Sequence, residues 1–227
     1  MVPDIGLIAL IIAFALSVYA TLLSVYGELS HQARWVASAR NATVAVFALL
    51  TISVLSVVYS LIVMDFSQAY VADVTSTAMS PFLRITALWG GQQGSVLFWA
   101  WLMSGFVAVV VLRKWESNAD LMPYIIFVAM LTTTFFVGVV VFITNPFTKM
   151  WIVPGAEDLV LAIFQPANGQ QYIPYEGSGL NPLLRHFGMI GHPPTTYLGF
   201  TGFVIPFAFA IAALLKKDTV SDLWIRS

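Results

Sequence analysis

The sequence predicts an all-α fold, a polytopic bundle of transmembrane helices that forms a single membrane domain over residues 1–227. Three observations predict it. Of the 227 residues, 59% are hydrophobic and only 9% are charged, whereas about a quarter of the residues in a soluble domain are charged. The mean hydropathy is +0.86. Long apolar runs recur along the chain, each long enough to cross a hydrocarbon core of about 30 Å.

Five apolar runs are expected to be membrane spans. About 20 residues are needed to cross the core, and such runs cover residues 5–26, 44–64, 96–112, 122–144 and 197–215. The first begins at Asp4 without a basic segment before it, so a retained helix is expected rather than a cleaved signal peptide. The span interiors carry no charges, which disfavours a quinone- or ion-handling respiratory subunit.

The distribution of Lys and Arg predicts the orientation. Seven basic residues fall on one side and three on the other, and the richer side is normally cytoplasmic. The N-terminus is therefore expected outside, with extracytoplasmic loops at residues 65–93 and 145–196. The seven are Arg34, Arg40, Arg113, Lys114, Lys216, Lys217 and Arg226, and the three are Arg84, Lys149 and Arg185.

The second of these loops is rich in Pro and Gly, so no long helix is expected in it before about Leu183. At most one short helix is expected, near residues 157–164. Other functions are disfavoured. There is no Cys for thiolate chemistry, and a net charge of −1 gives no field for nucleic acid. Phosphate-loop, nucleophile-elbow and zinc-protease motifs are absent from the sequence.

A segment rich in Trp and Gly, residues 88–101, lies where the first outer loop enters the third span. One interpretation is an aromatic belt at the membrane surface, with Gly allowing close helix packing. The other is a flat platform for a large planar ligand, in which Trp89 supplies a face, Gly leaves room, and Gln93 or Gln92 offers hydrogen bonds. The segment alone leaves both open.

Two histidines lie close together before the last span. Pro193 and Pro194 suit the first turn of a helix, which would put His192 at or just before its N-cap, on the membrane surface. A neutral imidazole there is either a polar anchor or a haem-iron ligand. His186 lies on a less constrained stretch. His31 is expected in a cytoplasmic loop, exposed to water.

Two arginines on the outer side run against the usual charge distribution. Arg84 and Arg185 could each clamp a carboxylate, such as a haem propionate. Each could equally pair with an acidic side chain of the outer loops. The candidates for that pairing are Asp65, Asp73, Glu157 and Glu176.

Several segments together closely resemble the CcmF-type haem lyases of cytochrome c maturation, from one end of the chain to the other. They are residues 2–6, 63–67, 70–72, 89–95, 145–147, 179–184, 191–200 and 206–212. The order of Asn-Pro-Leu-Leu before His-Pro-Pro is the most specific part. Gln93 is a departure, because many relatives carry Glu there.

The resemblance implies a component of a haem lyase (holocytochrome c synthase) of the bacterial inner membrane, which presents haem to apocytochrome c on the extracytoplasmic side. It implies that His192 is the first of two outer histidines that flank the haem and the expected iron ligand. Together with the physical arguments, it makes Trp89, Gln93, Arg84 and Arg185 the other expected haem contacts.

Members of that family continue into a Trp-rich motif and further histidines, and this chain ends at Ser227 before them. The chain is therefore expected to be the N-terminal portion of a larger haem-lyase architecture, inactive alone. The expected partners are a second polypeptide with the remaining haem site, apocytochrome c and a haem-delivering chaperone. The alternative function is a non-catalytic membrane scaffold for partner subunits or apocytochrome.

Overall fold

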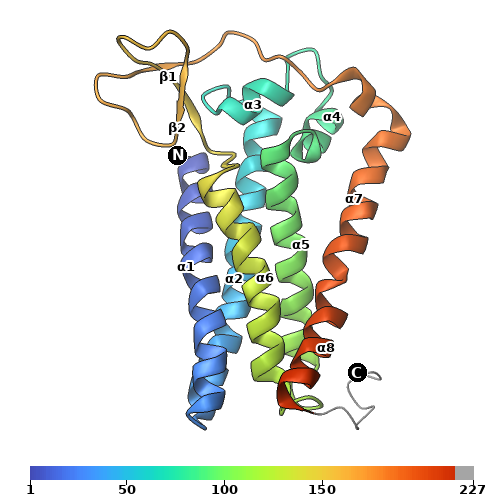
Figure 1. Ribbon diagram of the computed structural model, residues 1–227. Helices are drawn as coiled ribbons and strands as arrows, with labels where there is room; N and C mark the ends of the chain where they lie inside the picture. Colours follow the sequence, from blue (N-terminus) through green and yellow to red (C-terminus); the bar gives the residue numbers. More distant parts are fainter. Residues whose placement is uncertain (218–227) are drawn as a thin grey trace. The chain divides into compact units, whose positions relative to one another are not determined.

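Five helical segments long and apolar enough to span a membrane are present in the computed structural model, which describes residues 1–217. They are α1 (Val2–Leu29), α2 (Ala33–Val63), α5 (Gln92–Arg113), α6 (Met122–Phe142), and the pair α7 (Phe187–Gly202) and α8 (Val204–Lys216). The predicted mostly helical fold with five spans is confirmed (Figure 1). One residue of the charge count, Arg226, lies outside the described residues.

The residues divide into two compact units, and the helices contribute to both. The second unit comprises residues 9–51, 99–138 and the described part of 196–227. It is built from helices whose small residues admit aromatic rings: the ring of Phe47 lies against Gly105. The same ring stacks on Trp101, whose indole N–H donates to the Thr51 hydroxyl at 2.8 Å. Such pairing satisfies polar groups that lipid cannot.

Two basic side chains of this second unit, Arg40 and Lys216, bind groups on neighbouring segments. Arg40 was expected in a loop, but it lies in the second turn of α2, where its Nε donates to the Val111 carbonyl at 3.1 Å. The Arg40 guanidinium also lies 4.8 Å from the Trp115 ring centroid. Lys216 pairs with Asp120 at 3.2 Å. Each of these basic side chains therefore links its helix to a neighbouring segment of the same unit.

The first unit comprises residues 1–8, 52–98 and 139–195. Between α2 and α5 the chain forms α3 (Ala69–Val74), α4 (Pro81–Thr86) and the 3-10 turn η1 (Ala87–Trp89). α4 begins as its sequence predicts: Ser80 is the N-cap, its hydroxyl accepts from the Leu83 N–H, and Pro81 fills the first turn.

A small antiparallel sheet follows α6, in the order β2-β1-β3. Its strands are β1 (Lys149–Ile152), β2 (Val160–Ala162) and β3 (Gln170–Tyr172). The segment near residues 157–164, where the sequence allows at most one short helix, forms a strand instead, because residues 160–162 pair their backbone with β1. In Figure 1, β1 and β2 lie beside the start of α1, where Lys149 pairs with Asp4 at 3.4 Å.

The fifth span begins ten residues earlier than predicted, at Phe187 rather than residue 197. It is preceded by η2 (Pro182–Arg185), whose N-cap Asn181 accepts from the Leu183 N–H at 3.0 Å. Pro193 and Pro194 lie inside α7. The expectation that they form the first turn is wrong, because the helix already has its start five residues before His192.

Candidate functional site

Trp89 ends η1 and is half-buried in the first unit. Its ring stacks on Phe98 of α5, with centroids 5.8 Å apart and planes at 29°. Its backbone carbonyl accepts a hydrogen bond from the Ser95 hydroxyl at 3.2 Å. One face of the indole is thus held by the protein, which fixes the plane that the other face would offer to a ligand.

The glycines around Trp89 make room for protein groups. A Cβ on Gly94 would lie 2.0 Å from the Leu88 carbonyl and 2.3 Å from the Tyr70 hydroxyl, and one on Gly90 would lie 2.3 Å from Leu180. Tyr70 is 2% exposed and donates to the Ala87 and Leu88 carbonyls, at 2.7 and 3.0 Å. The idea that these glycines leave space for a planar ligand is therefore wrong.

Arg84 binds backbone carbonyls. Its Nε donates to Met79 at 3.0 Å, its Nη1 to Ile62 at 3.1 Å and its Nη2 to Thr77 at 3.3 Å. Among residues 1–217 it makes no ion pair, so none of the four acidic partners considered is used. The guanidinium instead joins the end of α2 to the chain around α4.

Residues 176–180 are joined by hydrogen bonds to the segment between α2 and α5. Ser178 N–H donates to the Ala72 carbonyl at 2.8 Å and Gly179 N–H to the Thr75 carbonyl at 3.2 Å. Glu176 accepts from the Thr77 hydroxyl and from the Thr77 N–H, the latter at 2.8 Å. The Thr77 hydroxyl has the largest effect on the carboxylate, and together the donors hold the pKa of Glu176 below its usual value.

The Arg185 guanidinium makes fewer hydrogen bonds than that of Arg84. Its Nε donates to the carbonyl of Leu180 at 2.9 Å, and Leu180 is 2% exposed against Gly90. Among the described residues, its Nη atoms have no hydrogen-bond acceptor. Arg185 therefore retains a guanidinium edge that can meet a carboxylate.

The two histidines before residue 197 lie at other positions than the sequence predicts. His186 lies at the start of α7: its Nδ1 accepts from the Gly188 N–H at 3.2 Å and its carbonyl from the Met189 N–H at 2.9 Å. His192 lies inside the helix and is exposed. Its imidazole has no hydrogen-bond partner within residues 1–217, so both ring nitrogens are free for a ligand or a metal ion.

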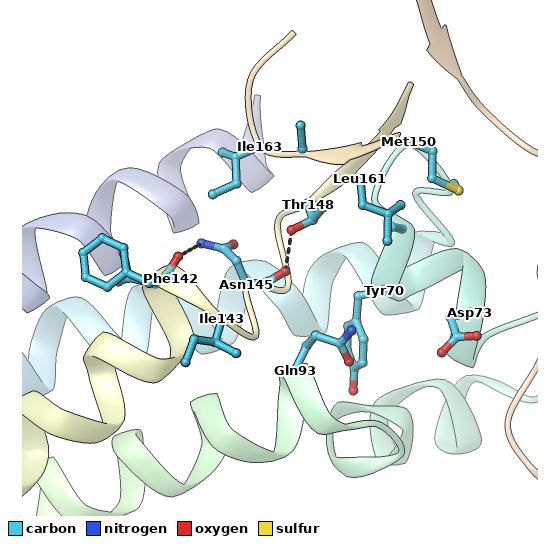
Figure 2. Close-up of a pocket in the computed structure, with 13 residues that line it drawn as sticks. Tyr70, Asp73, Gln93, Phe142, Ile143, Asn145, Thr148, Met150, Leu161 and Ile163 are labelled. Atoms are coloured by element: carbon cyan, nitrogen blue, oxygen red, sulfur yellow. Dashed lines mark hydrogen bonds between the residues drawn. The ribbon is translucent and has the colours of Figure 1, made fainter. Parts of the chain in front are cut away.

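Gln93 faces a cavity rather than the Trp89 ring. The cavity has a volume of about 630 Å³ and is lined by Gln93, Tyr70 and Asp73 on the helical side. Figure 2 shows Leu161 and Met150, from the sheet, on the opposite side. The sequence marks Tyr70 and its neighbours only through the resemblance, because a Tyr in a loop carries no signal of burial. It marks Asp73 only as a possible partner for arginine.

Comparison with known proteins places the chain in a family. A family model described as cytochrome c assembly protein matches residues 89–224, which is more than half of the chain. The chain belongs to this family. The family's matched region contains four of the five predicted contact residues, and Arg84 alone lies before it.

Relatives match along the full length. The cytochrome c-type biogenesis protein CcmF of Haemophilus influenzae is 30% identical over 100% of this chain and 32% of its own length. The CcmF proteins of Pseudomonas aeruginosa and Escherichia coli K12 are 31% and 32% identical over 100% and 95% of the chain. The chain thus spans about a third of the length of these relatives. The resemblance to CcmF-type proteins is confirmed.

A solved structure titled cytochrome c haem lyase CcmF has the same fold, with a TM-score of 0.76 and 22% identity over 99% of this chain and 32% of that one. With five membrane-spanning helices and bacterial CcmF relatives, this member of the family is a multi-pass bacterial membrane protein. Its described residues contain no cluster of three or more potential metal ligands.

Proposed function

We propose that this chain is the N-terminal part of a haem lyase, which presents haem to apocytochrome c on the extracytoplasmic side of the membrane. The end-to-end match to CcmF proteins at about 30% identity carries this proposal. The fold supports it, because five spans leave an ordered layer of loops and sheet at one end of α5 and α6. Chemistry on a secreted polypeptide needs such a layer outside the membrane.

The proposed orientation has the N-terminus outside. In this orientation the sheet, α3, α4 and the start of α7 are extracytoplasmic. The support is the distribution of basic residues, seven against three. Each of the three on the outer side has a structural use: Lys149 pairs with Asp4, while Arg84 and Arg185 bind carbonyls. These contacts give each of the three basic residues a structural reason to lie on the outer side.

His192 is the proposed iron ligand. Its imidazole is exposed, unpartnered in the described chain and held on a helix, which suits coordination of haem iron. Arg185 has a free guanidinium edge for a propionate, and Trp89 has one ring face to offer. Arg84 fits poorly, because its three donating nitrogens already bind carbonyls. Gln93 fits poorly too, because the nearby Asp73 would repel a propionate.

The proposed partners are a second polypeptide that supplies the remaining haem site, apocytochrome c and a haem-delivering chaperone. The chain corresponds to about a third of the CcmF relatives, and one free imidazole does not make a bis-histidine site. Isolated, it is expected to bind haem weakly or not at all.

Haem retention by purified protein tests the proposal. The chain would be purified alone and together with any polypeptide encoded beside it that matches the rest of CcmF. The expected result is a low-spin haem spectrum from the pair and little or none from the chain alone. A stoichiometric low-spin spectrum from the isolated chain would contradict the proposed division of the site.

A second candidate function is a non-catalytic scaffold. It is favoured by the use of Arg84 and the glycines around Trp89 in protein packing. The two functions differ in the same experiment: a scaffold would pull down its partner without changing the haem content of the complex when His192 is replaced by Ala. A haem-lyase part would lose haem in that variant while retaining the partner.

A further inference from the structure

The cavity lined by Gln93, Tyr70 and Asp73 has both polar and apolar side chains in its wall (Figure 2). Its volume of about 630 Å³ falls within the roughly 300–1,000 Å³ typical of small-molecule sites. All its lining residues belong to the first unit. It therefore has the size and composition to hold an amphipathic ligand.

Most of the polar groups in the cavity wall are already engaged. The Tyr70 hydroxyl donates to backbone carbonyls. Asn145 donates to the Val141 carbonyl at 3.2 Å and accepts from the Phe147 N–H at 2.9 Å, and Thr148 donates to the Asn145 carbonyl at 2.9 Å. None of these side chains is free to select a charged ligand.

Asp73 and Gln93 are the lining side chains with free polar atoms. Neither makes a hydrogen bond or an ion pair within residues 1–217, and no Lys, Arg or His lines the cavity. Figure 2 shows both side chains on the same part of the wall, with the Tyr70 ring between them. A carboxylate and an amide that line one cavity favour a cation that can donate hydrogen bonds to both, such as a primary ammonium. The same carboxylate repels an anionic group.

The position of the cavity indicates where the apolar part of the ligand lies. Gln93 is in the first turn of α5, and Phe142 is the last residue of α6, so the cavity lies where these two spans meet the membrane surface. Phe142 and Ile143 line it and are 72% and 76% exposed. Apolar side chains exposed at the end of a span face hydrocarbon, so lipid acyl chains reach the cavity edge.

We propose that this cavity binds the headgroup of phosphatidylethanolamine, with the ammonium at Asp73 and Gln93 and the acyl chains along Phe142 and Ile143. The choline headgroup cannot donate hydrogen bonds, and phosphatidylglycerol carries no cation and a net negative charge. The cavity therefore prefers phosphatidylethanolamine to phosphatidylcholine, and phosphatidylcholine to phosphatidylglycerol. This inference goes beyond the proposed haem-lyase function and does not depend on it.

Lipid retention by the purified full chain tests the inference. The chain would be exchanged into micelles with equal amounts of the three lipids, matched in acyl chains, and the bound lipid measured by native mass spectrometry. The expected result is about a fivefold enrichment of phosphatidylethanolamine over phosphatidylcholine. This is the factor expected from one charge-assisted hydrogen bond that is weakened by partial exposure to solvent. Asp73→Asn should abolish it with an unchanged melting temperature.

Asp158→Asn is the matched control, because Asp158 is an exposed acid of the same outer loops that does not line the cavity. It should retain the enrichment. Equal retention of the two lipids by the wild type, or an enrichment that survives Asp73→Asn, would overturn the inference. So would Asp73-dependent binding of a soluble lysine peptide without any lipid preference, since that would assign the cavity to a polypeptide.

Discussion

Gly94 lies where a methyl group has no room. A Cβ there would meet the Leu88 carbonyl at 2.0 Å, and backbone cannot move aside as a flexible side chain can. Gly94→Ala is expected to cost about 1–3 kcal/mol, as other overpacking substitutions do. It should also weaken the hydrogen bond from Tyr70 to Leu88. The measurement is the thermal midpoint of the purified chain in detergent.

Gly191→Ala is the matched control for this prediction. Gly191 also lies in a helix, but an added Cβ there meets nothing within 4 Å. Removing the flexibility of Gly from a helix interior gains up to about 1 kcal/mol, so this variant should be as stable as the wild type or more so. Equal midpoints for Gly94→Ala and wild type would show that the loop before α5 can shift to make room.

His192→Ala is expected to abolish cytochrome c maturation while the chain still inserts at normal levels. The reason is that His192 has the free imidazole, whereas the Nδ1 of His186 accepts a backbone hydrogen bond at the start of α7. His186→Ala should be nearly silent in the same assay. Added imidazole should partly restore the His192 variant by filling the vacant ligand position.

The opposite pattern would show that His186 is the ligand. Silence of both variants would leave His192 as a polar anchor at the membrane surface. The measurement is covalent haem in a reporter cytochrome, detected by haem staining, with the level of the chain followed by immunoblot.

Arg84 shows why sequence reasoning found the residues but not their contacts. The sequence singles out Arg84 because it is a basic residue on the side of the membrane where few basic residues are expected. Its acceptors, however, are carbonyls of Met79, Ile62 and Thr77, and any residue type has a carbonyl. The path of the folded chain decides which carbonyls lie near Arg84. A pattern of side chains along the sequence does not reveal that path.

The helices were more predictable than the sheet for a physical reason. A span needs about 20 apolar residues, and this is visible in any sequence. The strands have three or four residues, and the connections between them cover residues 153–159 and 163–169, too long for the two-residue turns that signal a hairpin. Strand β1 pairs with both neighbours, which no local pattern indicates.

The start of α7 was misplaced because Pro-Pro usually ends or begins a helix. Pro193 and Pro194 cannot donate to the carbonyls four residues before them, those of Met189 and Ile190. In α7 the Thr195 hydroxyl donates to the next carbonyls, those of Gly191 and His192, at 3.1 and 2.9 Å. The Thr195 hydroxyl therefore does not replace the two lost bonds, and the helix continues through Pro193 and Pro194 without them.

The contact between Glu176 and Thr77 predicts a pH-dependent loosening of residues 176–180. The pKa of Glu176 is lowered in the folded protein, so its contribution to stability is complete above the usual carboxyl pKa of about 4.3. The contribution is lost as the pH falls through the lower folded pKa. Hydrogen exchange at the amides of Thr77 and Gly177, corrected for intrinsic rates, should accelerate below about pH 4.

Glu176→Ala should show the fast exchange at every pH, because the acceptor of both amides is gone. Glu157→Ala is the matched control, since Glu157 is an exposed acid without a hydrogen-bond partner in the described chain. It should exchange like the wild type. Exchange in Glu176→Ala as slow as in the wild type at pH 6 would show that the carboxylate does not hold this segment.

Charge is sparse along the chain, and several of the charged side chains in residues 1–217 make structural contacts. Lys+Arg number 10 and Asp+Glu 11, and the pairs and carbonyl contacts of Lys149, Arg40 and Lys216 lie at helix ends. The same sparse charges are expected to set the orientation, because basic residues resist translocation across the membrane. The proposed orientation rests on seven of the 10 basic residues lying on one side.

Reporter fusions after Arg40 and after Lys114 are expected to read cytoplasmic. Arg40 lies in the second turn of α2, so a fusion there removes the rest of that span and reports the side of the turn after α1. Lys114 directly follows α5 and reports the turn before α6. A fusion at Asp158, between β1 and β2, is the control and should read periplasmic. A periplasmic signal at Arg40 or Lys114 would reverse the topology and place His192 and the lipid cavity on the cytoplasmic side, where apocytochrome c could not receive haem after export.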